Sequence, residues 1–238
     1  MAIRDARTVL QQIEVIKVKF RHEYKHQINL ADIYGLRTRL SAVAKHDPHA
    51  DEDGTYFIKS LYFDNYMDKA LREKLDGVNK REKFRIRYYG TDTSFIRLEK
   101  KSKINGMCNK ISCPVTAEEC QKIIDGNIEF MKDCEYELMR ELYAKMEYQL
   151  LRPKCIVAYT RECFVYLPGN VRVTLDMDIC GSNNVREFLN PDLQFMQTYQ
   201  NTILEVKWDE YLPQIIRDLV QVKSRRSAAF SKYAAIRM

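Results

Sequence analysis

Basic side chains recur at every second residue around Arg85 and Arg87. They alternate there with the apolar residues Phe84, Ile86 and Tyr88. Guanidinium groups bind phosphoryl oxygens bidentately, ammonium groups act as mobile point charges, and both stabilise charge that develops during phosphoryl transfer. A set of such cations pointing into one space therefore predicts a site for a phosphate-rich anion.

The same alternation occurs in segments far apart in the chain. They are Arg21-x-Glu23-x-Lys25, Arg97-x-Glu99-x-Lys101, Tyr159-x-Arg161, Arg172-x-Thr174-x-Asp176 and Glu205-x-Lys207. Successive side chains of a strand point to opposite faces, so each segment would present its charges on one face of a sheet. For a single strand, the simplest interpretation is an antiparallel sheet whose polar face meets water. All these strands together favour a closed barrel with a charged lumen, which must be hydrated or hold an anion because burying unpaired cations is costly.

Four carboxylates stand among these cations: Glu23, Glu99, Asp176 and Glu205. Mg²⁺ and Mn²⁺ prefer oxygen ligands, so these side chains could hold a divalent cation that bridges phosphate oxygens. The sequence has no glycine-rich phosphate-binding loop, so a nucleotide would be held by side chains on strands. The seven cysteines form no CxxC pair and are expected to be reduced, packed thiols.

The composition is typical of one globular domain, here residues 1–238. A hydrophobic content of 45% is enough for a substantial core, and 39 basic against 33 acidic residues give a mild excess of +6 that indicates an acidic partner. No stretch approaches the roughly 18 apolar residues that span a bilayer, and the segment Met1 to Gln12 lacks the apolar region of a secretory signal. We therefore expect a cytoplasmic protein without a transmembrane segment.

Helices are expected between these strands. Amphipathic spacing predicts one over 30–45, capping signals predict others over 65–77 and 116–126, the longest is expected over 127–151, and a last one begins near Pro213. Asp64 is expected at an exposed helix start, and the charged run 80–83 as a solvated loop. The chain is therefore α+β, dominated by a strongly curved antiparallel sheet.

Seven short motifs, in order, give the chain a family resemblance. They are Arg21-x-Glu23-x-Lys25, Ser60-Leu61-Tyr62-Phe63-Asp64, Lys83-Phe84-Arg85-Ile86-Arg87-Tyr88, Leu98-Glu99-Lys100-Lys101, Arg172-Val173-Thr174-Leu175-Asp176, Leu204-Glu205-Val206-Lys207 and Phe230-Ser231-Lys232-Tyr233. Together they resemble VTC domains, the polyphosphate polymerase domains of the vacuolar transporter chaperone complex, within the triphosphate tunnel metalloenzyme (CYTH-like) superfamily. The resemblance covers the chain from about Phe20 to Tyr233.

The resemblance implies a closed, eight-stranded antiparallel tunnel barrel with a charged lumen and with helices packed outside and at the ends. It implies transfer of the terminal phosphate of ATP to a growing polyphosphate chain, with Mn²⁺ or Mg²⁺. The phosphate ligands that it implies are Lys25, Arg85, Arg87, Lys101, Lys110, Arg161 and Arg172. Glu205 would be the metal ligand, and Tyr159, Ser231 and Lys232 would make further contacts with substrate or product.

One departure from the superfamily pattern favours polymerisation over hydrolysis. Hydrolytic members carry an ExExK first strand, and this chain has Arg21 in place of the first Glu. Two alternatives remain: a tunnel triphosphatase acting on tripolyphosphate or a nucleoside triphosphate, and a non-catalytic binder of polyphosphate or nucleic acid. Nucleic acid is disfavoured because the cations are expected inside a narrow lumen. VTC proteins often carry an SPX domain and membrane helices, which this sequence lacks, so delivery of product would need an unknown membrane-protein partner.

Overall fold

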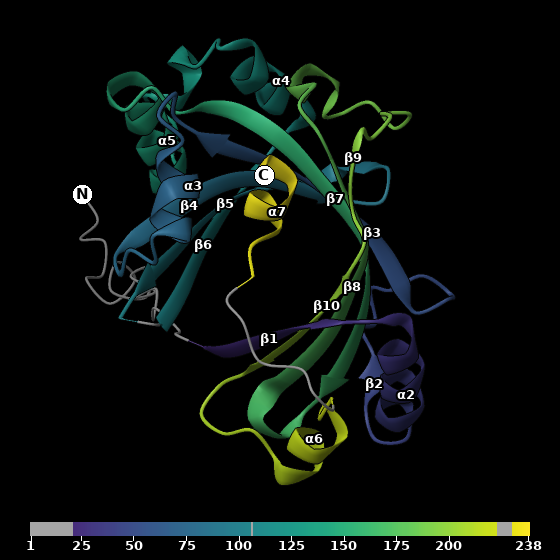
Figure 1. Cartoon of the computed structure of the whole chain (residues 1–238). Helices are drawn as coiled ribbons and strands as arrows, with labels where there is room; N and C mark the ends of the chain where they lie inside the picture. Colours follow the sequence, from purple (N-terminus) through teal and green to yellow (C-terminus); the bar gives the residue numbers. More distant parts are fainter. Residues whose placement is uncertain (1–20, 106, 223–229) are drawn as a thin grey trace, which may run out of the picture.

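The computed structural model describes residues 21–105, 107–222 and 230–238, and one antiparallel sheet dominates them (Figure 1). The strands are β1 (His22–Ile28), β2 (Lys45–His46), β3 (Thr55–Asp64), β4 (Arg81–Tyr89), β5 (Asp92–Ile104), β6 (Met107–Val115), β7 (Arg152–Tyr166), β8 (Val171–Ser182), β9 (Gln197–Tyr199) and β10 (Thr202–Trp208). The main path of the sheet runs β1-β10-β8-β7-β3-β4-β5-β6, while β2 pairs with β7 and β9 with β8.

The sheet curls so strongly that its two edges approach each other. Glu23 of edge strand β1 accepts hydrogen bonds from Lys101 of β5 at 3.2 Å, and an isolated antiparallel bridge joins Arg21 to Cys108 of edge strand β6. The described residues form no continuous ladder between β1 and β6, so the sheet is an open half-barrel. The expectation of a closed barrel was wrong in this respect, because side-chain alternation reports which face a residue occupies and not whether the edge strands pair.

The outer face of one half of the sheet carries the largest core. Ile86 of β4 and Leu98 of β5 are fully buried there against the helices α4 (Ala117–Asp125) and α5 (Glu137–Tyr148). Thr116 and Glu119 form the expected capping box at the start of α4. These apolar residues are the ones that alternate with the charged side chains, so burying one face presents the charges on the other.

The outer face of the other half packs against α2 (Leu30–Ser41) and α6 (Gln214–Leu219). Leu36 and Leu40 of α2 are fully buried with Val206 of β10 and Ile216 of α6. Burying each leucine contributes about 1.5–3 kcal/mol. Asn29 caps α2 by accepting from the Asp32 amide at 3.0 Å.

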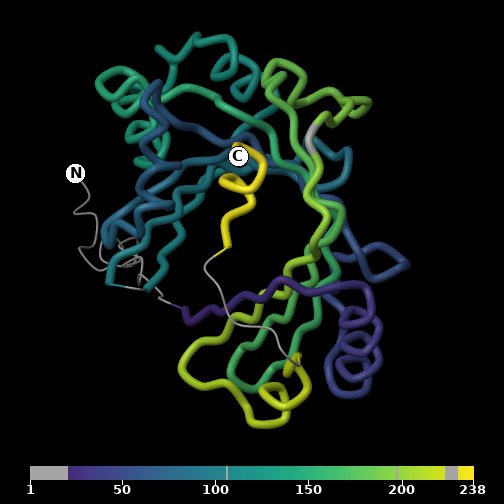
Figure 2. The backbone as a smooth tube through the Cα atoms, in the orientation of Figure 1, coloured from purple at the N-terminus to yellow at the C-terminus, as the bar shows by residue number. Residues whose placement is uncertain are grey.

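The inner face carries the C-terminal helix α7 (Lys232–Arg237), which lies within the curve of the sheet (Figures 1 and 2). Tyr233 and Ile236 pack against Tyr62 and Tyr159 in a small apolar cluster. A Cβ added to Gly181 of β8 would lie 2.1 Å from Ile236 Cγ2, so a glycine there allows the close approach. A helix on the inner face was not expected from the sequence.

The segment predicted as one long helix over 127–151 is broken. A short 3-10 helix, η1 (Glu129–Met131), is followed by an extended Tyr136 before α5 begins. Asp133 and Cys134, which lie in the gap, have low helix propensity. The break lets both Met131 and Leu142 bury completely in the same outer core.

The remaining short elements connect the strands. They are α3 (Lys69–Leu75), which begins four residues after the expected cap Asn65, and the 3-10 helices η2 (Pro168–Asn170) and η3 (Val185–Glu187). Among the described residues, no helix is long and apolar enough to cross a membrane.

Candidate functional site

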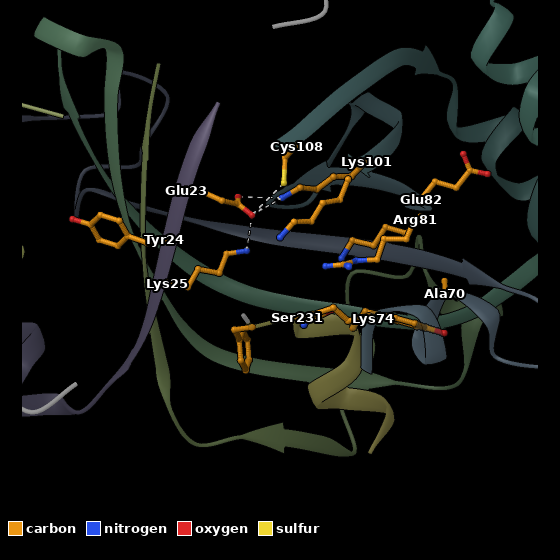
Figure 3. Close-up of a pocket in the computed structure, with 14 residues that line it drawn as sticks. Glu23, Tyr24, Lys25, Ala70, Lys74, Arg81, Glu82, Lys101, Cys108 and Ser231 are labelled. Carbon is orange, nitrogen blue, oxygen red and sulfur yellow. Dashed lines mark hydrogen bonds and ion pairs between the residues drawn. The ribbon is translucent and has the colours of Figure 1, made fainter. Parts of the chain in front are cut away.

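A cavity of about 260 Å³ opens on the inner face where the two edges of the sheet meet. Glu23 and Lys25 of β1 face Lys101 of β5 and Cys108 of β6 across it (Figure 3). The cations that line it are Lys25, Lys74, Arg81, Lys83, Lys101 and Lys103. Lysine and arginine from four different elements therefore converge on one space.

Two carboxylates pair with Lys25 of this cavity. Lys25 Nζ lies 3.4 Å from Glu23 Oε1 and 3.3 Å from Glu205 Oε1. Lys207 Nζ lies 3.0 Å from the same Glu205 oxygen. Burial opposes ionisation of Glu205, but Lys207 and Lys25 outweigh it and hold the pKa of this carboxyl well below its usual range. Glu205 is thus an anion inside a cationic cluster.

Arg85 is fixed in the middle of β4. Its Nε donates to Glu99 at 2.7 Å, its Nη1 donates to the Tyr62 hydroxyl at 3.0 Å, and Lys110 Nζ lies 3.1 Å from the other oxygen of Glu99. Burial raises the pKa of Glu99, but the charge of Arg85 outweighs it and the net shift is downward. One carboxylate therefore neutralises two of the expected phosphate ligands.

Arg87 differs from its neighbours Arg85 and Arg161. It is 6% exposed, and its guanidinium donates to the Ser60 hydroxyl at 3.1 Å and the Tyr159 hydroxyl at 2.9 Å. Among the described residues, no carboxylate lies within ion-pair distance of it. A buried cation without a contacting counter-ion is costly unless an anion joins it, so Arg87 marks a place for one.

Arg161 and Lys232 share the buried carboxylate of Asp176. Arg161 binds it bidentately at 2.6 and 2.8 Å, and Lys232 pairs with the second oxygen while lying 4.5 Å from the centre of the Tyr159 ring. Burial raises the pKa of Asp176, but Arg161 and Lys232 outweigh it and lower the pKa to about 2. These side chains bring β7, β8 and α7 together beside Arg87.

The structure gathers most of the residues expected to form the site. Ion pairs and hydrogen bonds join Lys25, Lys101, Arg161, Glu205 and Lys232 through Glu23, Glu205 and Asp176, and join Arg87 to Tyr159. Arg85 and Lys110 form a second set around Glu99. Arg172 lies farther along the inner face, where it pairs with Asp47 and its side chain is 41% exposed. The Ser231 hydroxyl caps α7 by accepting from the Ala234 amide at 3.4 Å.

Several residues that the sequence did not single out also face this space. Arg81 and Lys83, which were expected in a solvated loop, belong to β4 and line the cavity. Burial lowers the pKa of Lys83 to about 8. Tyr62 lies between Lys83 and Arg85. Burial raises the pKa of its phenol, but Arg85 and Lys83 outweigh it and lower the pKa to about 7. Extending the alternation of Arg85 and Arg87 backwards along β4 would have found Lys83.

The acidic residues fit a metal ion shared with a bound phosphate. Among the described residues, no group of three or more acidic, histidine or cysteine side chains is placed to hold a metal alone. Glu23 and Glu205 nevertheless flank the same Lys25 ammonium, and both are oxygen donors. Mg²⁺ is commonly held by one or two carboxylates together with substrate phosphate oxygens and water. This donor set therefore suits a substrate-bridged ion rather than a protein cage.

Comparison with solved structures finds a similar fold in a distant protein. A candidate adenylate cyclase from Bacillus halodurans is 12% identical, with a TM-score of 0.51 over 79% of this chain and 80% of that one. A candidate adenylate cyclase from Vibrio parahaemolyticus is 8% identical, with a TM-score of 0.45 over 85% of this chain and 83% of that one. The Mimivirus capping enzyme triphosphatase is 10% identical, with a TM-score of 0.39 over 91% of this chain and 95% of that one. At these identities the likeness concerns the fold alone.

Comparison with sequence families is more specific. No curated protein matches the chain. The profile of the VTC domain, however, matches residues 20–237, nearly the whole sequence. This range contains every strand that the structure describes and the inner-face cations named above. The chain therefore belongs to the VTC domain family.

Proposed function

We propose that this protein is a polyphosphate polymerase that transfers the terminal phosphate of ATP to the end of an inorganic polyphosphate chain on its inner face. The single observation that carries this proposal is the buried guanidinium of Arg87, which only hydroxyls contact among the described residues. Cations of β1, α3, β4 and β5 line the cavity farther along the same face, so a linear polyanion can meet positive charge along its length.

Bound phosphates take over the role of the internal carboxylates. Without substrate, Glu23, Glu99 and Asp176 each neutralise at least one cation. A triphosphate entering the same space would share these cations, so the site exchanges one set of anionic partners for another without moving the strands. Rigid strands hold the cations in place, which lowers the cost of reorganisation during transfer.

The residues have distinct roles in this proposal. Arg85, Arg87 and Lys101 stabilise the charge that develops as the phosphoryl group moves, and Arg172, which the family resemblance groups with them, lies farther along the inner face beside Asp47. The side chains that hold the substrate and the product chain are Lys25, Lys110, Tyr159, Arg161, Ser231 and Lys232. A Mn²⁺ or Mg²⁺ ion, held by Glu205 with Glu23 beside it, would supply further positive charge to the phosphate oxygens.

The reaction needs little covalent work from the protein. The oxygen of the chain-end phosphate attacks the terminal phosphorus of ATP, the bond to the bridging oxygen breaks, and ADP leaves with that oxygen. The attacking oxygen is already anionic, so no strong general base is required. Hydrolysis would instead need a group that activates water. Neither activity is excluded by the lack of a base, because the pKa values of Tyr62 and Lys83 are lowered to about 7 and about 8. The balance of products separates the two activities.

The balance of products tests the proposal. We expect purified protein with ATP and Mn²⁺ to release ADP while free orthophosphate stays well below the ADP formed, because the phosphate enters the polymer. Equal amounts of ADP and orthophosphate would make the protein a triphosphatase. Binding of polyphosphate without any release of ADP would make it a non-catalytic binder.

A further inference from the structure

A second cavity, of about 450 Å³, opens on the inner face at the other end of the strands. The order of side chains along β4 shows the relation between the two cavities. Arg81 and Lys83 line the first cavity, Arg87 follows in the centre, and Tyr89 lines the second. The proposed phosphate site therefore lies between two openings.

Aromatic rings dominate the walls of the second cavity. Tyr56 of β3, Tyr89 of β4 and Phe95 of β5 lie there with His49. The Tyr56 and Tyr89 rings meet edge to face, with their centres 5.7 Å apart. Tyr89 is 37% exposed and Phe95 55% exposed, so ring surface remains available. Exposed rings around a concave space form a stacking surface for a flat, uncharged group.

The charged residues that line the two cavities also differ. Six cations and two acids line the first. In the second, Arg172 is paired with Asp47, and Asp92 adds a further carboxylate. A polyanion is therefore favoured at the lysine-rich end and in the centre, whereas the aromatic end suits a neutral heterocycle with polar edges.

The second cavity also lies within reach of Arg87 and Arg161. Tyr89 is two residues from Arg87 on the same face of β4, which corresponds to about 7 Å at the rise of a strand. Tyr56 pairs directly with Arg161 across β3 and β7. A molecule with a flat group on the rings could thus place its phosphates on these two arginines.

We infer that the cavity formed by Tyr56, Tyr89 and Phe95 binds the base of a nucleoside triphosphate whose phosphates contact Arg87 and Arg161. The inference rests on the proposed function in that it assumes a triphosphate on the inner face. The base stacks against the rings, while Asp92 can accept hydrogen bonds from the polar edge of the base or from the ribose. Inorganic tripolyphosphate has no group for this cavity and gains nothing from it.

Calorimetric titration with two ligands separates this site from the phosphate site. The variant Tyr89→Leu with Phe95→Leu removes two partly exposed rings, and Tyr148→Leu, at an 86% exposed position of α5, is the matched control. Metal-free buffer prevents turnover during the titration. We expect the double variant to bind ATP about tenfold more weakly, because stacking of a base is worth about 1–3 kcal/mol. Its affinity for tripolyphosphate should stay within about twofold of wild type, and Tyr89→Phe should retain ATP binding.

Equal weakening for ATP and tripolyphosphate, or unchanged ATP binding, would overturn the base site. Photolabelling with 8-azido-ATP gives an independent result that does not depend on a variant. We expect the label on peptides from β3 or from the turn between β4 and β5; a label near Phe230, at the other cavity, would overturn the inference. Selective loss of ATP affinity in a protein that makes no polyphosphate would keep the base site and refute the polymerase.

Discussion

Arg87 carries more of the proposed chemistry than any other residue of the inner face. Its neighbours Arg85 and Arg161 each have a carboxylate partner, whereas Arg87 contacts Ser60 and Tyr159. We expect Arg87→Ala to lower turnover by at least about a hundredfold, the loss typical of a donor aimed at transition-state charge. Steady-state rates of ADP release measure this effect. The exposed Arg186→Ala is the control, and a near-normal rate for Arg87→Ala would remove the inner face from the mechanism.

Tyr62 reports the positive charge of the site. Burial raises the pKa of its phenol, but the charges of Arg85 and Lys83 prevail and lower the pKa to about 7, so the phenolate is stabilised in the fold. This stabilisation is present above the ordinary tyrosine pKa of about 10 and is lost as the pH falls through about 7. A bound polyanion disfavours the phenolate and should restore the proton.

An ultraviolet titration of phenolate absorbance measures this coupling. We expect wild type to show one tyrosine that ionises near pH 7, Tyr62→Phe to lack it, and tripolyphosphate at about pH 8 to reduce the signal with uptake of a proton. If no tyrosine ionises below about pH 9, the cationic field at the site is weaker than the geometry indicates.

Asp64 joins the end of β3 to α3 and α7, two helices that line the first cavity. Its carboxylate accepts from the Ala70 and Leu71 amides at 2.8 and 3.1 Å, at the start of α3, and from the Tyr233 hydroxyl of α7 at 2.7 Å. We expect Asp64→Ala to lower the free energy of unfolding by at least about 2 kcal/mol, because buried donors lose their partner. Urea unfolding measures the loss, and Asp76→Ala, at an exposed position, should change it little. Equal stability of both variants would contradict this role of Asp64.

The sequence predicted the inward face of each strand better than it predicted whether the sheet closes into a barrel. Alternating charges placed Arg85, Glu99 and Glu205 on one face of their strands, because burial of the apolar neighbours fixes that face. The same rule could not show that Asp64 is 1% exposed, since its carboxylate accepts from the adjacent Asn65 amide and also from partners six, seven and 169 residues away. The position of α7 depends likewise on a distant contact, Ile236 against Gly181. Long-range partners of this kind leave no local pattern.

At the scale of the whole molecule, curvature decides which anions can reach the cations. Edge strand β1 meets the opposite side of the sheet through Glu23 and Lys101 of β5, so a thin chain can enter where a rigid duplex cannot. We expect duplex DNA to bind with a dissociation constant no tighter than about 10⁻⁶ M, the range of non-specific binding, while polyphosphate binds more tightly at the same salt concentration. Filter binding with both polymers tests this, and tight binding of the duplex would mean that the charged faces lie outside.

The product itself is the most direct test of polymerase activity. Purified protein is incubated with ATP and Mn²⁺, and the products are separated on a polyacrylamide gel stained for polyphosphate, with Glu205→Gln alongside. We predict a ladder of chains from wild type and none from the variant, because the amide cannot replace the buried carboxylate beside Lys25 and Lys207. Release of orthophosphate without a ladder, or a ladder of equal strength from both proteins, would contradict a polymerase whose metal ion depends on Glu205.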